Sequence, residues 1–203
     1  RQRQMCIRDS IYRDQKNYNK ALENYFASLK ISEAIGDKGR ISTAYNSIGI
    51  IYSDQGNYDK ALENYFSALK IMEVLGDNLG IASSYINIGI IYYNQAELLK
   101  RPESKEHREQ LYNKALENYF SALKIMEALG NKSGIAMSYY NIGSVYLNQN
   151  NIAKAKEQAL LSLVIAKDIG EKEAILKSLQ SLSRCDSAAG NFKGAYEYHK
   201  LFK

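Results

Sequence analysis

The strongest constraint on the fold of this chain is that its sequence repeats itself. Residues 58–77 read YDKALENYFSALKIMEVLGD, and residues 112–131 read YNKALENYFSALKIMEALGN; the two are identical at seventeen of twenty positions. A third copy at residues 18–37 matches the first at fourteen of twenty positions. Self-similarity at a fixed period indicates one supersecondary unit stacked on itself. The sequence therefore predicts a solenoid, in which each unit packs against its neighbours along one array.

The repeat has a constant period of forty positions, because anchor alanines recur at that step from Ala21 to Ala61 and from Ala115 through Ala155 to Ala195. The step from Ala61 to Ala115 is longer by fourteen positions, so one unit carries an insertion of that length. We expect a single array over residues 11–203. Its parts are a partial repeat (11–40), a full repeat (41–80), a repeat with the insertion near 96–110 (81–134), a full repeat (135–174) and a truncated, degenerate repeat (175–203).

Each unit reads as helix, short turn, helix. Apolar residues recur three and four positions apart between residues 44 and 52 and again between residues 58 and 72, which is the spacing of a buried helix face. Asn57 is placed as an N-cap, Gly76 as the left-handed residue after a helix, and Asp77 as the next N-cap. Gly49 lies in mid-helix, where glycine costs roughly 1 kcal/mol against alanine. That cost is explained if the partner helix, with its small Ala61, passes close by.

These residues resemble a known family. The order aromatic, aliphatic, Gly, Tyr, Ala, aromatic, Ala resembles the tetratricopeptide repeat (TPR), and it is carried here by Tyr45, Ile48, Gly49, Tyr52, Ala61, Tyr65 and Ala68. The series recurs from Tyr85, weakens from Tyr139 and degrades from Leu179. The usual repeat has about 34 residues, so this chain resembles the long-repeat arrays of bacterial sensor and regulatory proteins. The resemblance implies an all-α fold, a right-handed α-solenoid of stacked antiparallel helix pairs.

In the resembling family the first helix of each unit lines a concave binding face. Asparagine offers a donor and an acceptor to a peptide backbone, and exposed tyrosine offers apolar area with a polar tip. In long-repeat relatives an asparagine ahead of the Leu-Gly pair holds peptide backbone; Asn87 and Asn141 match that place, whereas Ser47 and Ser181 depart from it. The expected partner-binding residues are Asn46, Ile50, Ile86, Asn87, Tyr93, Asn94, Tyr140, Asn141, Asn148, Lys177, Gln180 and Arg184.

Two of these groups have a more specific expected role. Tyr93 and Tyr140 are not repeat-scaffold tyrosines, and we expect them to contact the ligand, although they would also serve to shield the groove. Lys177 and Arg184 would attract an acidic ligand or a C-terminal carboxylate.

The first functional interpretation is a non-catalytic protein–protein interaction scaffold that binds a peptide or a partner helix. The alternative is the sensory or regulatory part of a larger bacterial signalling protein, such as a histidine kinase, a nucleotide cyclase or a transcription regulator. A receptor for a quorum peptide is a further hypothesis. No enzyme is expected, because His107 and His199 have no carboxylate or cysteine at catalytic spacing. No metal and no cofactor are expected.

The composition limits the kinds of partner that we expect for this chain. The net charge is +5, but the basic residues do not form the stripe that nucleic-acid binding needs, so no nucleic acid is expected. No run of 18 apolar residues occurs, so no membrane span is expected within this chain. The two cysteines, Cys6 and Cys185, form neither a disulfide framework nor a metal-ligand pattern. The location stays open: the cytoplasm is favoured, and the periplasm also fits.

Both ends and the insertion carry separate expectations. The repeat pattern begins abruptly at Ile11, so residues 1–10 are interpreted as a non-native or disordered leader, the alternative being a frayed native terminus. Lys203 lies inside a helix, which favours a fragment of a larger protein with a possible fusion to a C-terminal signalling domain. The insertion predicts a charged helical hairpin with Pro102 near its tip, each helix gaining about two turns. It is either a solvated extension or a docking spur.

Overall fold

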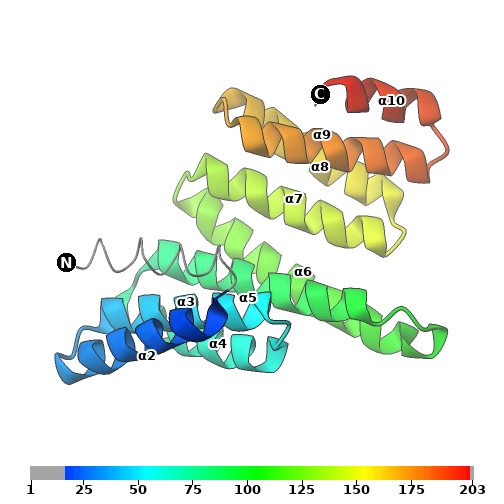
Figure 1. Ribbon diagram of the computed structural model, residues 1–203. Coiled ribbons are helices and arrows are strands. Elements are labelled where there is room, and N and C mark those ends of the chain that lie inside the picture. The colour runs from blue at the N-terminus through cyan, green and yellow to red at the C-terminus, as the bar shows by residue number, and fades with distance from the viewer. Residues whose placement is uncertain (1–16, 202–203) are drawn as a thin grey trace. The chain divides into compact units, whose positions relative to one another are not determined.

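The computed structural model of the chain describes residues 17–201. Within these residues the chain forms α-helices, one short 3-10 turn and no strand, so the predicted all-α fold is confirmed (Figure 1). The interpretation of residues 1–10 lies outside the described residues. The elements are α2 (Tyr18–Ala34), α3 (Lys38–Asp54), α4 (Tyr58–Leu75), α5 (Asn78–Leu98), η1 (Pro102–Ser104), α6 (Lys105–Ala128), α7 (Lys132–Asn148), α8 (Ile152–Asp168), α9 (Lys172–Ala188) and α10 (Phe192–Leu201).

The helices belong to two compact units. Unit 1 ends at Ile91 and unit 2 begins at Tyr92, so the boundary falls inside the continuous helix α5. In unit 1, α3 packs against α2 and α4; in unit 2, α7 packs against α6, α8 and α9, and α9 packs against α8 and α10 (Figure 1). Packing of each helix on its neighbours is the arrangement of a helical-repeat solenoid.

Short polar residues begin most of these helices. The side chains of Asn17, Asn57, Asn151 and Asn191 each accept a hydrogen bond from the backbone N–H three residues on, at the start of a second helix. This is the N-cap arrangement, which satisfies one of the four free N–H groups at a helix start. The first helices use the same device at Asp37, Asp77 and Asn131. The predicted caps at Asn57 and Asp77 are therefore confirmed.

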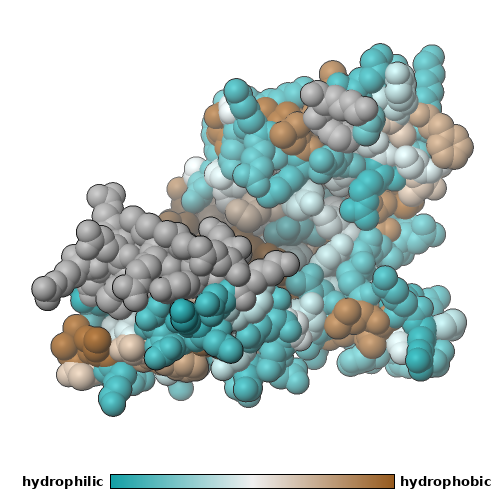
Figure 2. Space-filling model, viewed as in Figure 1, coloured by the Kyte–Doolittle hydropathy of each residue, from teal (hydrophilic) through white to brown (hydrophobic). Residues whose placement is uncertain are grey.

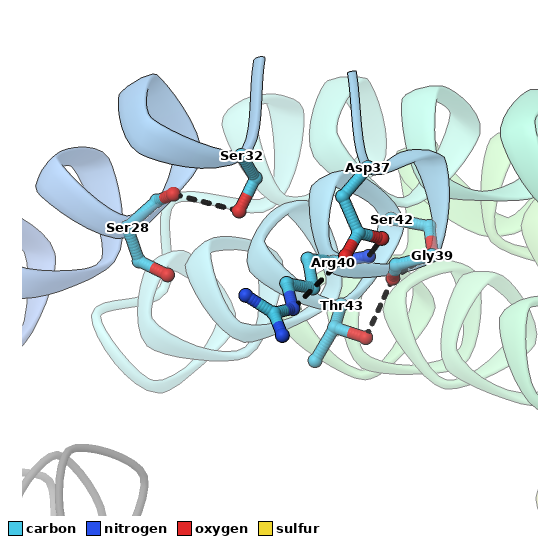
Figure 3. A network of polar contacts seen from close by, with 7 residues as sticks. All are labelled: Ser28, Ser32, Asp37, Gly39, Arg40, Ser42 and Thr43. Atoms are coloured by element: carbon cyan, nitrogen blue, oxygen red, sulfur yellow. Dashed lines mark hydrogen bonds and ion pairs between the residues drawn. The ribbon is translucent and has the colours of Figure 1, made fainter. Parts of the chain in front are cut away.

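The turn between α2 and α3 shows the device in detail (Figure 3). Asp37 accepts a hydrogen bond of 3.0 Å from the backbone N–H of Arg40 and forms an ion pair of 2.9 Å with its Nε. The carbonyl of Gly39 accepts hydrogen bonds from the hydroxyls of Ser42, at 2.8 Å, and Thr43, at 2.9 Å. The polar side chains of this turn are thus used locally to start the helix.

Glycines end the helices in the left-handed conformation. Gly76 has a φ of 66°, as the sequence predicted, and Gly56 and Gly190 follow the first helices with φ of 73° and 76°. Within the described residues, a single non-glycine residue has positive φ: Asn150, at 61°. It occupies the place that Gly56 and Gly190 fill in their own repeats.

The mid-helix glycines lie where a second helix passes closely. A Cβ added to Gly49 would lie 2.7 Å from Cε1 of Tyr65, on the facing helix α4. A Cβ added to Gly143 would lie 3.3 Å from the carbonyl oxygen of Ala155 on α8. The close approach predicted from Gly49 and its repeats is therefore present in both units.

Each unit has its own apolar core between helix pairs. In unit 1, Leu29, Ala44 and Ile48 form a buried cluster, with Tyr45 and Tyr52 packed against it. In unit 2, a corresponding cluster consists of Ala159, Leu163, Leu179 and Leu182. The cores therefore lie between successive helices, as repeat stacking requires.

The last repeat replaces one recurring contact by another. Three repeats place a lysine ammonium 5.2–5.4 Å from a tyrosine ring centre, in the pairs Tyr52–Lys60, Tyr92–Lys114 and Tyr146–Lys154. One repeat period after the third pair, the equivalent places hold Asp186 and Gly194. The side chain of Asp186 is 4% exposed, forms an ion pair with Lys156, and accepts a hydrogen bond of 3.1 Å from Nδ2 of Asn191. A cation–π contact is thus exchanged for a buried ion pair.

The insertion lengthens α5 and α6 unequally. Helix α5 has 21 residues against 17 in α3, and α6 has 24 against 18 in α4. The expectation of about two turns on each helix was therefore wrong for α5, which gains about one turn. The physical reason lies in the caps: buried Leu111 stands where Asn57 caps α4, so α6 does not start there and runs back to Ser104. Pro102 begins the connecting 3-10 turn.

The visible face of the molecule in Figure 2 is mostly hydrophilic, with separate hydrophobic patches. Exposed apolar side chains include Phe26, Phe66 and Phe120, which hold equivalent places in three second helices. No helix between residues 17 and 201 is both long and apolar enough to cross a membrane. Over the same residues, no group of three or more histidine, cysteine or acidic side chains is arranged to hold a metal ion.

Candidate functional site

The predicted binding residues are divided between the two units, and each set is described by itself. In unit 1, Asn46 and Ile50 are half-buried on α3, and Asn87 is half-buried on α5, whereas Ile86 is only 6% exposed. The Oδ1 atom of Asn46 is buried and has no hydrogen-bond partner within the described residues. Unit 1 therefore contributes one asparagine, Asn46, with a buried polar atom that has no partner in the described residues.

In unit 2 several predicted residues come together around Tyr93, near the end of α5. The hydroxyl of Tyr93 accepts a hydrogen bond of 2.9 Å from Nδ2 of Asn148 on α7. The ring of Tyr93 lies 6.2 Å, between ring centres, from the ring of Tyr112 on α6. The hydroxyl of Tyr112 donates in turn to the carboxylate of Glu97 on α5. We call these four side chains the tyrosine cluster.

Electrostatics extend the tyrosine cluster to α9. Burial raises the pKa of the Tyr93 hydroxyl, and Glu97 raises it further, while Arg184 on α9 and the bond from Asn148 lower it; Tyr140 adds a smaller rise. Arg184 and Tyr140 therefore lie within electrostatic reach of Tyr93. Burial also raises the pKa values of Tyr112 and Tyr119 strongly. All three hydroxyls stay protonated at neutral pH and act as neutral hydrogen-bonding groups.

The other predicted residues of unit 2 differ in whether their polar groups already have hydrogen-bond or ion-pair partners. Tyr140 and Asn141 are half-buried on α7, and Nδ2 of Asn141 is buried without a hydrogen-bond partner among residues 17–201. Lys177 forms an ion pair of 2.7 Å with Glu173 one turn earlier on α9, so its charge is already balanced. Arg184 is exposed and forms no ion pair in the described part of the chain.

The two remaining predicted binding residues also lie on first helices: Asn94 is half-buried on α5, and Gln180 is exposed on α9. Helices α5, α7 and α9 therefore each contribute polar side chains that were predicted for the binding face.

Sequence reasoning missed two members of the tyrosine cluster. Tyr112 recurs with Tyr18 and Tyr58, which is the pattern of a scaffold residue, and Glu97 is one of the charged residues of the insertion. The usable signal was the insertion itself, because it extends α5 so that Glu97 can reach a tyrosine on the following helix.

The polar groups of this site are suited to hydrogen bonding. The described residues of the site offer neutral hydroxyls, carboxamides, the carboxylate of Glu97 and the cation of Arg184. Cys185, on α9, is fully buried, and burial raises the pKa of its thiol, so it is held as the unreactive protonated form.

Fold and site together define an all-α helical-repeat protein whose first helices carry several polar side chains. Two sequence profiles described as tetratricopeptide repeat match the chain, one over residues 10–73 and 40–99, the other over residues 136–168. Their matches together span more than half of the chain, which therefore belongs to the tetratricopeptide repeat family. No curated protein matches it.

Solved structures with the same fold include BtubC (BKLC) from P. vanneervenii, at 20% identity and a TM-score of 0.80, covering 98% of this chain and 77% of that one. A STAND protein with a tetratricopeptide repeat sensor, from Pyrococcus horikoshii, is 21% identical with a TM-score of 0.77, covering 98% of this chain and 29% of that one. A Rap protein complexed with Competence and Sporulation Factor is 17% identical with a TM-score of 0.77, covering 96% of this chain and 51% of that one. At these identities the likeness shows the fold alone.

Proposed function

We propose that this chain is a non-catalytic protein-interaction scaffold, and that the first helices of unit 2 bind a peptide or a partner helix. The observation that carries the proposal is the gathering of Tyr93, Tyr140, Asn148 and Arg184, from three successive first helices, into one electrostatically connected group. Side chains from three successive repeats that lie within electrostatic reach of Tyr93 would offer a track for an extended ligand.

The state of these side chains supports ligand binding. A buried amide without a partner, such as Nδ2 of Asn141, costs about 1–3 kcal/mol relative to a satisfied one. If the half-buried side chain of Asn141 turned toward a bound peptide, a peptide carbonyl would satisfy that N–H group. Arg184, which forms no ion pair within residues 17–201, adds a cation that favours an acidic ligand. The Rap protein, which has this fold, was crystallised with Competence and Sporulation Factor, and this also supports a ligand-binding role.

The test starts from a peptide selected on the purified chain from a displayed random library. Its affinity is then measured by calorimetry for Tyr140→Ala and Asn141→Ala. We expect each variant to weaken binding about tenfold, which corresponds to about 1.4 kcal/mol. Asn118→Ala is the matched control, because that asparagine lies on the second helix α6 and its amide bonds the Lys114 carbonyl. Equal affinity in all three variants would refute a site on the first helices.

A second candidate function is the sensory part of a larger bacterial signalling protein, fused to a histidine kinase, a nucleotide cyclase or a transcription regulator. It is favoured by the likeness to the STAND protein, whose repeats are described as a sensor and of which this chain covers 29%. The coding sequence beyond Lys203 tests it. A hydrophobic segment of about 20 residues or signalling-domain motifs would support the fusion, and an early stop codon would contradict it.

A further inference from the structure

A hollow of about 400 Å³ lies in unit 2, where the extended ends of α5 and α6 meet the end of α7. Volumes of roughly 300–1,000 Å³ are usual for ligand sites. Five of its lining residues, Ala96, Glu97, Leu99, Lys100 and Arg108, lie within the insertion near 96–110, so a regular repeat would have no such hollow. The polar lining consists of Glu97, Lys100, Arg108, Tyr112, Asn148 and Asn150.

The charged side chains that line the hollow have a net positive charge. The carboxylate of Glu97 accepts a hydrogen bond from the hydroxyl of Tyr112, and its negative charge is outweighed by the two positive charges of Lys100 and Arg108. Arg108 uses Nη1 to donate a bond of 3.1 Å to the carbonyl of Leu99, and a guanidinium has five N–H donors in all. Lys100 is exposed and forms no ion pair among residues 17–201. The unused groups are therefore cationic donors.

Asn150 adds a second, independent feature. It takes the left-handed backbone conformation, which asparagine adopts more readily than most residues with a side chain, at a place where the equivalent turns have Gly56 and Gly190. A glycine there would leave the hollow without this amide. Asn150 makes no side-chain hydrogen bond within the described chain, so its donor and acceptor are free for a peptide group.

We propose that this hollow binds a carboxylate of an acidic peptide segment, and that it extends the peptide-binding face of unit 2. The inference rests on the proposed function, because Asn148 both lines the hollow and donates to Tyr93 in the tyrosine cluster. Lys100 and Arg108 carry two positive charges against the one negative charge of Glu97, which leaves one positive charge to match a single ligand carboxylate. A phosphate group carries about −1.5 to −2 charges and would need more cations.

Three N-acetylated tripeptides serve as probes, and backbone amide NMR shifts of the full 23.0 kDa chain are the readout. Triglutamine with a free C-terminus carries only a terminal carboxylate. Gln-Glu-Gln amide carries only a side-chain carboxylate. Triglutamine amide carries none. We expect saturable shifts at Arg108, Asn148 and Asn150 with one or both carboxylate probes, and none with the neutral probe; the probe that binds more tightly identifies the source of the carboxylate.

Variants make the assignment specific. Lys100→Gln and Arg108→Gln should each weaken carboxylate binding about tenfold, while Lys105→Gln, an exposed lysine on α6 outside the lining, should leave it unchanged. Arg108→Lys should retain part of the affinity if charge is what matters. Equal binding of the neutral probe, equal losses in all the glutamine variants, or no shifts in the hollow would each overturn the inference.

The two proposals fail in different ways. If the selected library peptide binds through Tyr140 and Asn141 while no probe enters the hollow, the carboxylate inference is wrong and the scaffold function stands. If the probes occupy the hollow while Tyr140→Ala and Asn141→Ala leave the affinity for the library peptide unchanged, the proposed peptide-binding face on the first helices is wrong. The carboxylate site in the hollow is then supported without it.

Discussion

Single residues decide how closely the helices of a pair approach. Gly49 is the clearest case, since an added Cβ would lie 2.7 Å from the ring of Tyr65, and that ring is 3% exposed and enclosed. Overpacking of this kind costs about 1–3 kcal/mol, whereas alanine gains about 1 kcal/mol in helix propensity. We therefore expect Gly49→Ala to lower the free energy of unfolding, measured by urea denaturation.

Gly39 supplies the control for this prediction, because it is also helical and its added Cβ would meet only Asp37 Oδ1 at 3.6 Å, an ordinary contact. Gly39→Ala should leave stability unchanged or raise it by up to about 1 kcal/mol. If the two variants were equally stable, the close approach of α3 and α4 at Gly49 would be wrong.

The buried tyrosines predict a loss of stability in alkali. Burial raises the pKa values of Tyr93, Tyr112 and Tyr119 in the folded chain above the ordinary value near 10. As pH rises through about 10, the unfolded chain loses these protons first, so the folded chain binds more protons and the free energy of unfolding falls. Below that pH the contribution is constant.

The measurement is urea unfolding at pH 8, 10 and about 11, with phenolate absorbance recorded alongside. Stability should drop between the upper two values, and the drop should be smaller in Tyr93→Phe, which removes one of the groups. Full tyrosine ionisation near pH 10 in a chain that is still folded would show that these hydroxyls are not protected.

At the scale of elements, the insertion is an addition to a complete helix pair. Removing residues 97–110 joins Ala96 to Leu111 and restores the regular repeat register. With Ala96→Gly and Leu111→Asn, the junction regains a glycine turn and an N-cap like Gly56 and Asn57. We expect this shortened chain to keep its helix content and to unfold cooperatively, because the packing between repeats is retained.

Circular dichroism and thermal unfolding test that expectation, and the carboxylate probes then provide the functional readout. The shortened chain should fail to bind the probes, because Lys100 and Arg108 are absent. A shortened chain that does not fold would instead show that the insertion is required for stability.

The contact between α9 and α10 predicts a non-additive pair of substitutions. An added Cβ on Gly194 would overlap the carboxylate of Asp186, so Gly194→Lys alone should be destabilising. Asp186→Tyr alone removes the partner of Lys156. Together they recreate the Tyr146–Lys154 contact of the preceding repeat and relieve the overlap. Urea unfolding of the four proteins should give a favourable coupling of roughly 0.5–3 kcal/mol; strictly additive effects would contradict it.

At the scale of the whole molecule, local signals explain why so much of the fold was predictable. Asn57, Gly76 and Asp77 act within one turn of chain, so their roles can be read from neighbouring residues alone. The candidate site depends on distant pairs instead: Tyr93 and Asn148 are 55 positions apart. Their contact depends on how successive repeats pack, which no local pattern specifies. The balancing of Lys177 by Glu173 was local and could have been predicted from their spacing.

Repeat stacking also predicts where a destabilising change is felt. Lys156→Ala leaves the Asp186 carboxylate, whose side chain is 4% exposed, without its cation. Breaking a buried pair costs roughly 3–5 kcal/mol, and less is expected here because the Lys156 side chain is 38% exposed. Since each repeat is stabilised by its nearest neighbours, the loss should stay near α9 and α10.

Hydrogen exchange followed by mass spectrometry measures this directly. Amides of α9 and α10 should exchange faster in Lys156→Ala, while those of α2 and α3 keep their protection. Lys154→Ala is the matched control: it removes a lysine from the same helix, but that ammonium lies 5.2 Å from the Tyr146 ring centre and leaves no buried charge unpaired. Equal loss of protection in α2 and α3 would mean that the chain unfolds as one cooperative body, because a nearest-neighbour array transmits such a defect only to adjoining repeats.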